Sequence, residues 1–340
     1  MIRLKDIAQR AGVSVMTVSK VLRDAPDISA ITKARIRTLA QQMGYVPDSL
    51  AQGLRTRKSK LLGLVVSAIT NPIFVRLVLA IEERAFETGY DVIIAHSLNQ
   101  PEREEMVIHR LLSRRVDGLL IAPVYRLTPA APVYTELLKR DVPTVIIGHH
   151  APFCSQFVSV ETDDLQASYA VTQHLIGLKH RCIAFFTGPP VCPWAQERLD
   201  GYRRALREAG LEVDDRLIFN AGATIEEGEK AARQMLSESP KVTAVQAVND
   251  LVAMGAANVL LDSGLQIPRD ISVAGFGNFL ASEFYRVPLT TIRQPKYRLG
   301  TAAMVVLMKL LGGDRPDSVR LPATMVVRGS TGSPAPPTVG

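Results

Sequence analysis

The first twenty residues carry apolar side chains at helical spacing, interrupted by one glycine. Ile7, Ala8 and Ala11 lie one, three and four residues apart, so they form the buried stripe of a first short helix. Gly12 ends that helix, because glycine adopts the left-handed C-cap conformation without strain. Ser14 can then cap a second helix by accepting a hydrogen bond from a backbone N–H of its first turn. The pattern predicts two short helices joined by a tight turn.

The predicted second helix has one apolar face and one mixed face. Val18, Val21 and Leu22 are expected to point inward. The other face carries small polar, apolar and basic side chains, namely Val15, Met16, Thr17, Ser19 and Lys20. Such a face suits insertion into a DNA major groove, with the N-terminus of the helix near phosphate. An ordinary helical hairpin at the end of a globular domain has the same pattern, so the pattern leaves both interpretations open.

A third helix is predicted from the N-cap candidate Ser29 to residue 43, and Gly44 ends it. Three helices within the first 46 residues form only a marginal core. This unit is therefore expected to depend on a partner or on DNA for full order.

The connector from residue 47 to residue 60 has Leu50 and Leu54 four residues apart, followed by basic residues that begin with Arg55. A helix this short is not stable alone in water, so the pattern favours a hinge that folds on DNA. Leu54 is a candidate wedge for a minor groove. A plain flexible linker is the alternative, although it would not need the two leucines at helical spacing.

From residue 61 onward, short apolar runs alternate with amphipathic stretches. This alternation is typical of parallel strands joined by crossover helices. The expected strands of a first series are 61–66, 92–95, 118–122 and 144–148, with helices at 74–88, 102–114 and 135–140. A second series has strands at 182–187, 217–220, 244–248 and 272–276, with helices at 165–178, 197–209, 225–237 and 251–263. Two doubly wound halves would hold a ligand between them, at the carboxyl ends of their strands.

Charge separates the first 60 residues from the rest of the chain. They contain 12 Lys and Arg against 4 Asp and Glu, a net charge of +8, whereas residues 61–340 contain 28 and 29, a net charge of −1. Together these give the net charge of +7 of the whole chain. A basic unit on a neutral body is the footprint of nucleic-acid binding. A merely solvated basic surface is the weaker alternative, because the excess coincides with the helix-turn-helix pattern.

Composition indicates a cytoplasmic protein. No apolar run is long enough to span a bilayer, and charges interrupt the first ten residues where a signal peptide would be apolar. The three cysteines, Cys154, Cys182 and Cys192, have no metal-ligand spacing and fit a reducing compartment. We expect no metal and no cofactor, and a location in the cytoplasm in association with the nucleoid.

Several motifs together resemble the LacI/GalR family of bacterial transcription regulators. They are Asp6-Ile7-Ala8, Ala11-Gly12-Val13-Ser14, Thr17-Val18-Ser19, Gly44-Tyr45-Val46-Pro47, Arg115-Val116-Asp117-Gly118, Arg198-Leu199-Asp200-Gly201-Tyr202, Asn249-Asp250, Pro268-Arg269-Asp270-Ile271 and Leu289-Thr290-Thr291-Ile292-Arg293-Gln294-Pro295. The resemblance implies a homodimer on a pseudo-palindromic operator. It also implies a core similar to periplasmic binding proteins, with a small effector in the cleft. The paired headpieces would occupy half-sites about 34–36 Å apart.

The resemblance also assigns residue roles in DNA binding. Val15, Met16 and Lys20 fall at the base-reading positions, where Lys20 can donate to guanine and the two apolar side chains can pack on thymine methyls. Ser14, Thr17 and Ser19 are expected to contact phosphate. Leu50, Leu54 and Arg55 are the DNA-binding residues expected in the hinge.

The residues expected at the effector are Asn71, Phe74, Trp194, Arg198, Asn249, Asp250 and Asn278. Arg198 matches the family's effector-contacting arginine, and its guanidinium suits vicinal hydroxyls or a carboxylate. Asp250 can instead be a helix N-cap, and Trp194 can instead fill a core or edge position. Gly277 stands where many members of the family have an aspartate, and Asn278 is a substitute for that role. A sugar or a sugar acid is the expected effector.

The α/β core alone does not exclude an enzyme. The chain has no phosphate-binding Gly-Lys-Ser/Thr loop, no third glycine after Gly275-Phe276-Gly277 and no coherent catalytic triad. His149 and His150 are adjacent and would point apart in a strand, so they make a poor metal pair. We therefore expect a ligand-controlled repressor with no catalytic residue. A cytoplasmic ligand-binding module, or a sugar-processing enzyme with a non-specific basic headpiece, is the alternative.

The expected organisation has four parts. A helix-turn-helix headpiece spans residues 1–46 and a hinge helix and linker span 47–60. The effector-binding and dimerisation core spans 61–330, and a disordered tail, rich in Pro, Gly, Ser and Thr, spans 331–340. Within the core, one subdomain is expected at about 61–160 and 291–320, and the other at about 161–290 and 321–330.

Overall fold

A computed structural model describes residues 2–46, 58–239 and 241–334 of the 340-residue chain. The chain divides into two units, Met1–Ser59 and Lys60–Gly340. The expected hinge helix, with Leu50, Leu54 and Arg55, lies outside the described residues. No helix of the described segments is long and apolar enough to cross a membrane.

Residues 2–46 of the first unit form three helices, which confirms the predicted arrangement. They are α1 (Leu4–Ala11), α2 (Val15–Leu22) and α3 (Ala30–Gln42). Gly12 has a φ of 65°, the left-handed C-cap conformation expected of it. Ser14 Oγ accepts from the backbone N–H of Thr17 at 3.0 Å, and Ser29 Oγ accepts from Thr32 at 3.3 Å, so both predicted N-caps are confirmed. The small core is Ile7, Ala8, Val18, Val21, Ile36 and Ala40.

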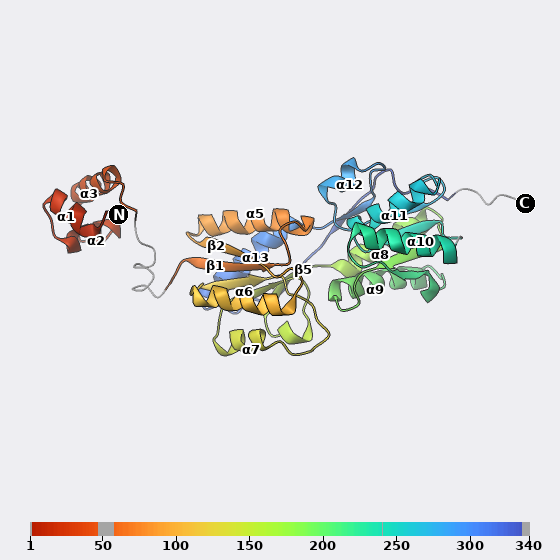
Figure 1. Ribbon diagram of the computed structural model, residues 1–340, viewed down its shortest axis with the longest axis horizontal. Coiled ribbons are helices and arrows are strands. Elements are labelled where there is room, and N and C mark those ends of the chain that lie inside the picture. Colours follow the sequence, from red (N-terminus) through yellow and green to blue (C-terminus); the bar gives the residue numbers. More distant parts are fainter. Residues whose placement is uncertain (1, 47–57, 240, 335–340) are drawn as a thin grey trace, which may run out of the picture. The chain divides into compact units, whose positions relative to one another are not determined.

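The first lobe of the second unit is a six-stranded parallel sheet in the order β11-β5-β4-β3-β1-β2. Its strands are β1 (Leu61–Val66), β2 (Asp91–His96), β3 (Gly118–Ile121), β4 (Thr144–Ile147), β5 (Val158–Thr162) and β11 (Val319–Leu321). Its helices are α5 (Pro72–Glu87), α6 (Pro101–Ser113), α7 (Pro132–Lys139) and α13 (Lys296–Leu311). Helices α5 and α13 cover one face of the sheet, and α6 and α7 cover the other, as Figure 1 shows.

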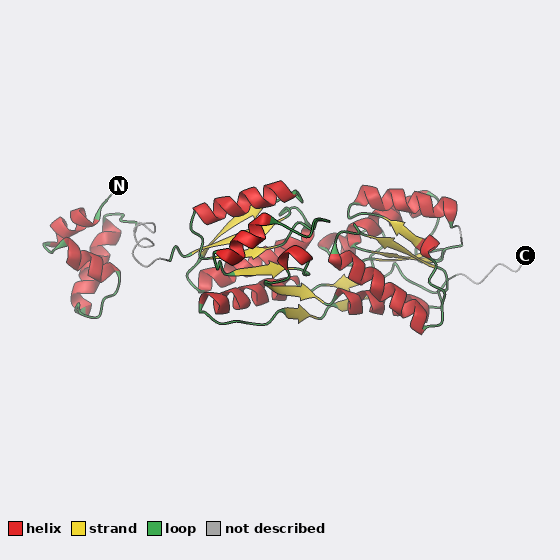
Figure 2. Cartoon of the chain, turned by 90° about the horizontal axis from the view of Figure 1, so that it is seen from below, coloured by secondary structure: helices red, strands yellow, loops and turns green. Residues whose placement is uncertain are grey.

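The second lobe has a four-stranded parallel sheet in the order β7-β6-β8-β9. Its strands are β6 (Ile183–Thr187), β7 (Ile218–Asn220), β8 (Ala244–Ala247) and β9 (Ser272–Ala274). Its helices are α8 (Asp164–Gly177), α9 (Pro193–Glu208), α10 (Ile225–Glu238), α11 (Asp250–Asp262) and the short α12 (Leu280–Phe284). Figure 2 shows each set of strands with helices on both sides. Helices α8 and α9 pack on one face and α10 and α11 on the other, so the expected doubly wound architecture is confirmed.

The chain passes between the lobes three times. It leaves the first lobe from β5 into α8, returns from β10 (Thr291–Arg293) into α13, and leaves again from β11 into β12 (Thr324–Val326). Strands β10 and β12 pair with each other in antiparallel fashion, and β10 also bridges to Gly277 after β9. Residues 291–293 therefore belong with the second lobe, whereas we expected 291–320 in the first.

The sequence analysis missed β5. Its polar Ser159 and Glu161 interrupt the apolar run on which strand prediction depends. The predicted disordered tail is also wrong at its first residues. Thr331 Oγ1 lies 3.0 Å from His174 Nε2, and the Gly332 N–H donates to Ser272 Oγ at 3.0 Å. These side chains hold the tail against the second lobe at least as far as Gly332.

Candidate functional site

Helix α2 presents the residues expected to read bases. Val15 and Met16 are 47% and 64% exposed, although both are apolar. Apolar side chains that are exposed at the start of a helix can pack against thymine methyl groups in the major groove. The hydroxyls of Ser14 and Thr17 lie 2.9 Å apart, so the capping serine also orients the threonine. Ser19 is half-buried, and its carbonyl accepts from Arg23 Nε at 2.8 Å.

Lys20 does not extend freely from this surface. Its ammonium group forms an ion pair with Asp27, in the connection that follows α2. The side chains are 40% and 53% exposed, so water screens the pair and it is easy to open. The sequence analysis missed this partner, because Asp27 is seven residues away and belongs to no repeating pattern. The pair directs the Lys20 ammonium group toward Asp27, and one of its three N–H donors is engaged there.

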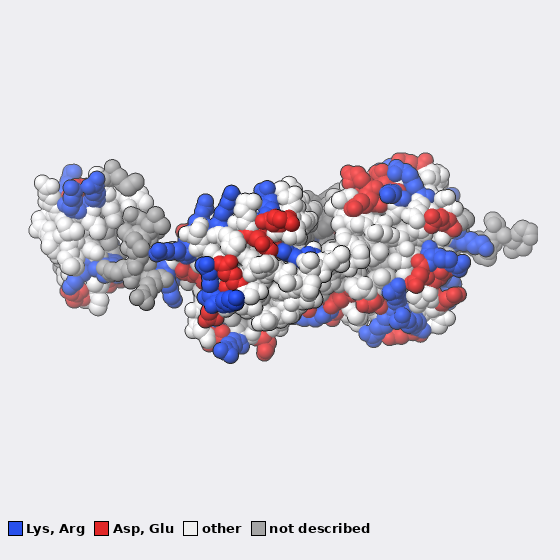
Figure 3. All heavy atoms as spheres, turned by 60° about the horizontal axis from the view of Figure 1, so that its bottom comes forward, with Lys and Arg blue, Asp and Glu red and all other residues white. Residues whose placement is uncertain are grey.

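The basic surface of the first unit is partly neutralised in the same way. Asp24 accepts ion pairs from Lys33 and Arg37 of α3, at 3.0 and 2.7 Å. Lys33 and Arg37 accordingly hold the pKa of the Asp24 carboxyl below its ordinary value. Charges on the second unit are mixed instead, as Figure 3 shows, with Lys and Arg interspersed among Asp and Glu.

The second site is built around Arg198 on α9, in the second lobe. Its Nε and Nη2 both donate to Asp164 Oδ2, at 3.2 and 2.8 Å, and its Nη1 donates to the carbonyl of Val248 at 2.7 Å. The guanidinium carbon lies 3.7 Å from the ring centre of Phe276 and 4.9 Å from that of Trp194. The Arg198 guanidinium, which we expected to contact the effector, thus donates to protein groups and lies over two aromatic rings.

Asp164 is the first residue of α8 and follows the crossing from β5. Its side chain is 2% exposed and lies within electrostatic reach of His149 in the first lobe. Burial raises the pKa of the Asp164 carboxyl, and Arg198 and His149 act against that shift. Its second oxygen, Oδ1, is buried and accepts no hydrogen bond from any group in the described segments. A buried acceptor without a donor is costly, so this atom needs a partner.

Glu197, next to Arg198 on α9, links the two lobes. It accepts from Arg320 Nη2 of β11 at 2.5 Å, and its Oε2 lies 3.1 Å from His149 Nε2, which follows β4. His149 Nε2 lies within ion-pair distance of Glu197 Oε2, but it makes no direct hydrogen bond to a described group. Arg320 also pairs with Glu161 and Asp163, at 3.1 and 3.2 Å.

Protonation across this contact depends on neighbouring charges. Burial lowers the pKa of His149, but Glu197, Asp164 and Glu161 outweigh burial and raise it above its ordinary value. Burial raises the pKa of Glu197, but His149 and Arg320 outweigh it and lower that pKa. Both shifts favour the charged forms of His149 and Glu197, the two groups that meet between the lobes.

Asn249 and Asp250 have structural partners. Asn249, not Asp250, caps α11, since its Oδ1 accepts from the Val252 N–H at 2.8 Å. Asp250 is fully buried, and its carboxylate accepts from the Phe279 N–H at 3.0 Å. It also accepts from the hydroxyls of Ser282 and Thr291, at 2.6 and 2.5 Å. The N-cap interpretation of Asp250 is therefore wrong, and its carboxylate oxygens already have donors.

Asn278 lies in the loop after β9. It has a φ of 51°, and its Oδ1 accepts from Arg328 Nη2 at 2.9 Å. Lys296, at the start of α13, is 8% exposed and donates to the carbonyls of Gly277 and Asn278. Burial lowers the pKa of Lys296 to about 8. The loop in which Gly277 replaces the family's aspartate is thus contacted by two cationic side chains, Arg328 and Lys296.

In the first lobe, Asn71 caps α5 by accepting from the Ile73 N–H at 3.3 Å, and Phe74 is 8% exposed in the sheet core. Trp194 is half-buried and packs on the core of the second lobe as well as over Arg198. The structure therefore brings Trp194 and Arg198 together with the ends of β8 and β9. Asn71 and Phe74 have roles within their own lobe.

Four residues of the second site were not predicted, namely His149, Asp164, Glu197 and Lys296. A position directly after a strand was the available signal for Asp164, and it was lost when β5 was missed. Two hollows on the described surface lie elsewhere, one between α10 and α11 and one beside β7. No cluster of His, Cys, Asp and Glu suited to a metal ion is found in the described segments.

A helix-turn-helix unit joined to two parallel-sheet lobes defines a DNA-binding regulator with a ligand-binding body. Residues 3–48 match the model for bacterial regulatory proteins of the lacI family. Residues 59–328 match the model for periplasmic binding proteins and the sugar-binding domain of the LacI family. The chain therefore belongs to the LacI family, and it is a ligand-regulated, DNA-binding repressor.

Individual relatives agree with this assignment. The chain is 33% identical to the ribose operon repressor of Escherichia coli K12 over 334 residues, which cover 97% of this chain and 100% of the relative. The lac repressor dimer bound to operator and the anti-inducer ONPF has a TM-score of 0.87 at 29% identity, with 97% of this chain and 99% of that chain covered. The transcriptional regulator CelR in complex with cellobiose has a TM-score of 0.74 at 30% identity, with 97% and 100% covered.

Proposed function

We propose that the chain binds a pseudo-palindromic operator as a homodimer and that a small sugar-like effector changes its affinity for that operator. The observation that carries the proposal is the outer face of α2. Val15 and Met16 are exposed there, beside Lys20, on a helix whose N-cap and core are formed. A folded helix that holds apolar and cationic side chains outward has the chemistry to read base edges.

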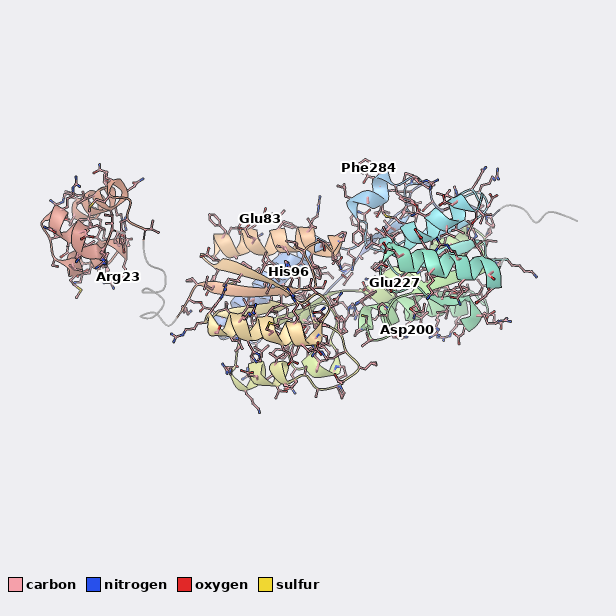
Figure 4. All side chains as sticks on the ribbon, viewed as in Figure 1. Arg23, Glu83, His96, Asp200, Glu227 and Phe284 are labelled. Atoms are coloured by element: carbon pink, nitrogen blue, oxygen red, sulfur yellow. The ribbon has the colours of Figure 1, made fainter. Side chains whose placement is uncertain are left out.

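Self-association is supported by apolar side chains exposed on the second unit. Val75, Leu79 and Phe86 of α5 are 57%, 49% and 80% exposed. On α12, Leu280 and Phe284 are 80% and 76% exposed, and Figure 4 shows Phe284 at the outer edge of that helix. Clusters of exposed large apolar side chains are typical of interfaces. The relative solved with operator is also a dimer.

Control by a ligand is supported by the contacts between the lobes. His149 and Arg320 from the first lobe meet Glu197 of the second, so a ligand that binds here shifts the balance between open and closed arrangements. Such a shift changes the geometry beneath the headpieces and hence their affinity for DNA. Relatives named for ribose and solved with cellobiose support a sugar-like effector. Operator affinity measured with and without the effector distinguishes induction, in which the affinity falls, from corepression, in which it rises.

The test is selection of bound sequences from random duplex DNA with the full chain, at a stated salt concentration. Recovery of a two-fold pseudo-palindrome with a fixed centre is expected. Lys20→Ala should relax base preference at one position in each half-site, whereas Arg10→Ala, on α1, should leave the recovered sequence unchanged. Equal loss of affinity for operator and random DNA in Lys20→Ala would contradict the base-reading role.

Dimer formation is tested by sedimentation velocity. Leu79→Lys, on α5, should shift the chain toward monomer, because it places a charge in the proposed interface. The matched control is Leu127→Lys, since Leu127 is 89% exposed in the loop between β3 and α7. Equal behaviour of the two variants would place the interface away from α5.

We also propose that the protein is not an enzyme and acts in the cytoplasm at the nucleoid. Its relatives are transcriptional regulators, and the charged groups of the second site are paired with one another. An enzyme would retain turnover of a bound sugar after removal of residues 1–59, so absence of product in that assay supports the proposal. A pure ligand-binding module would recover no motif in the selection.

A further inference from the structure

We infer that Asp164 determines effector specificity: its Oδ1 accepts a hydrogen bond from a hydroxyl of an uncharged polyhydroxy ligand, and the site rejects the corresponding acid. This inference rests on the proposed function, and it narrows the effector from sugars and sugar acids to neutral sugars. It assigns to Asp164 the role in recognition that sequence analysis gave to Arg198.

The geometry around Asp164 separates its two oxygens. Both hydrogen bonds from Arg198 go to Oδ2, at 3.2 and 2.8 Å, and leave Oδ1 buried without a donor in the described segments. The two hydrogen bonds from Arg198 favour the ionised carboxylate and hold its orientation. An ionised oxygen in a dry site binds an O–H donor strongly and gains nothing from a second acceptor. A ligand hydroxyl satisfies it, whereas a ligand carboxylate does not.

The surrounding charges favour a neutral ligand in the same way. Glu161, Asp163 and Glu197 share one guanidinium, that of Arg320, and Asp164 has that of Arg198. Four carboxylates thus face two guanidinium groups, and His149 adds at most one further positive charge. A ligand carboxylate would add another negative charge to an excess that already exists.

Arg198 and Lys296 do not offset this excess of negative charge, because both already donate hydrogen bonds to protein groups. The Arg198 guanidinium donates to Asp164 Oδ2 and to the Val248 carbonyl, and it lies over the rings of Phe276 and Trp194. The buried Lys296 donates to the carbonyls of Gly277 and Asn278. An acid would have to displace these contacts, and the neutral sugar keeps them.

The single tryptophan provides the assay. Trp194 stacks over Arg198, so its fluorescence reports ligand at the site. The full chain is titrated with cellobiose and D-ribose, and with the matched acids cellobionate and D-ribonate. Saturable binding of at least one neutral sugar is expected, with its acid at least about tenfold weaker. The deoxy analogues of that sugar, measured on the wild-type chain, should identify one hydroxyl whose removal costs a similar factor.

Asp164→Asn should weaken the neutral sugar by about tenfold and reduce the discrimination against the acid, because the amide can turn a donor toward the ligand. Asp200→Asn is the matched control. Asp200 lies on α9 and accepts from Gln196 Nε2 at 3.0 Å, so asparagine removes one negative charge outside the group of carboxylates that pair with Arg198 and Arg320. The control should retain wild-type affinity for the neutral sugar. Thermal unfolding of both variants verifies that they fold, and the deoxy series tests the inference without any variant.

Three results would overturn the inference: binding of an acid as tightly as its parent sugar, unchanged affinity in Asp164→Asn, or no binding of either neutral sugar. Failure of the proposed function is distinct from these results. A chain that selects a DNA motif but binds neither sugar refutes only the role of Asp164. A chain that binds a sugar but selects no motif refutes the regulator and leaves the sugar site in place.

Discussion

Removal of Arg198 alone should destabilise the second lobe more than removal of the whole ion pair. The side chains of Arg198 and Asp164 are 7% and 2% exposed, so little solvent screens the charge that remains when one partner is lost. Loss of one member of a buried pair costs about 3–5 kcal/mol. Arg198→Met is the informative change, because methionine keeps an unbranched apolar side chain beside Phe276 and Trp194 while it removes the charge.

The double variant Asp164→Asn with Arg198→Met removes the uncompensated carboxylate. It should regain roughly 2 kcal/mol of the free energy of unfolding that Arg198→Met loses, because neighbouring sites of this kind are not additive. Full recovery is not expected. The carbonyl of Val248 also loses its donor, Arg198 Nη1, and remains buried.

The assay is urea unfolding of the full chain, followed by the fluorescence of Trp194. This residue lies beside the pair and reports on the second lobe directly. The single variant should lower the midpoint at unchanged slope, and the double variant should lie between it and the wild type. A loss below about 1 kcal/mol in Arg198→Met, or a double variant less stable than the single one, would refute the assignment of a desolvated ion pair. The expected destabilisation, in contrast, would mean that loss of effector response in Arg198 variants does not by itself prove a direct ligand contact.

Two further predictions concern other ion pairs. Because the pKa of His149 is raised in the folded chain, its contribution to stability is complete below its ordinary pKa and is lost as the pH rises through the raised value. The pKa of Glu197 is lowered, so its contribution is present above its ordinary pKa and is lost on acidification through the lowered value. Wild-type stability should fall as the pH rises through the raised pKa of His149, and the same fall in His149→Gln would exclude His149 as its source. In the first unit, Asp27→Asn should raise affinity for the selected operator by releasing Lys20, as measured by fluorescence anisotropy at fixed salt. Asp24→Asn removes the same charge without releasing Lys20, so an equal gain in both variants would indicate general electrostatics alone.

Local features of the fold could be predicted because they depend on neighbours in sequence. Ser14, Gly12 and Ser29 mark helix ends through bonds that span at most four residues, and the structure has all three at the predicted places. The alternation of apolar runs and amphipathic stretches likewise predicted two doubly wound lobes. Strand β5 was missed since Ser159 and Glu161 break its apolar run. Its neighbours in the sheet, not its own pattern, make it a strand.

The candidate sites divide in the same way. Sequence alone determined that the chain begins with a basic helix-turn-helix unit, which residues face outward from its second helix, and that Arg198 belongs to an α/β body. Only the tertiary structure decided which groups those side chains meet. Asp164 is 34 residues from Arg198, and Arg320 is 123 residues from Glu197. Helix caps and periodicity follow from covalent spacing, but an ion pair across such separations depends on how strands and helices pack. Sequence therefore predicted an arginine that contacts the effector, whereas packing produced an arginine paired with Asp164 and a buried Asp164 Oδ1 that has no donor within the described residues.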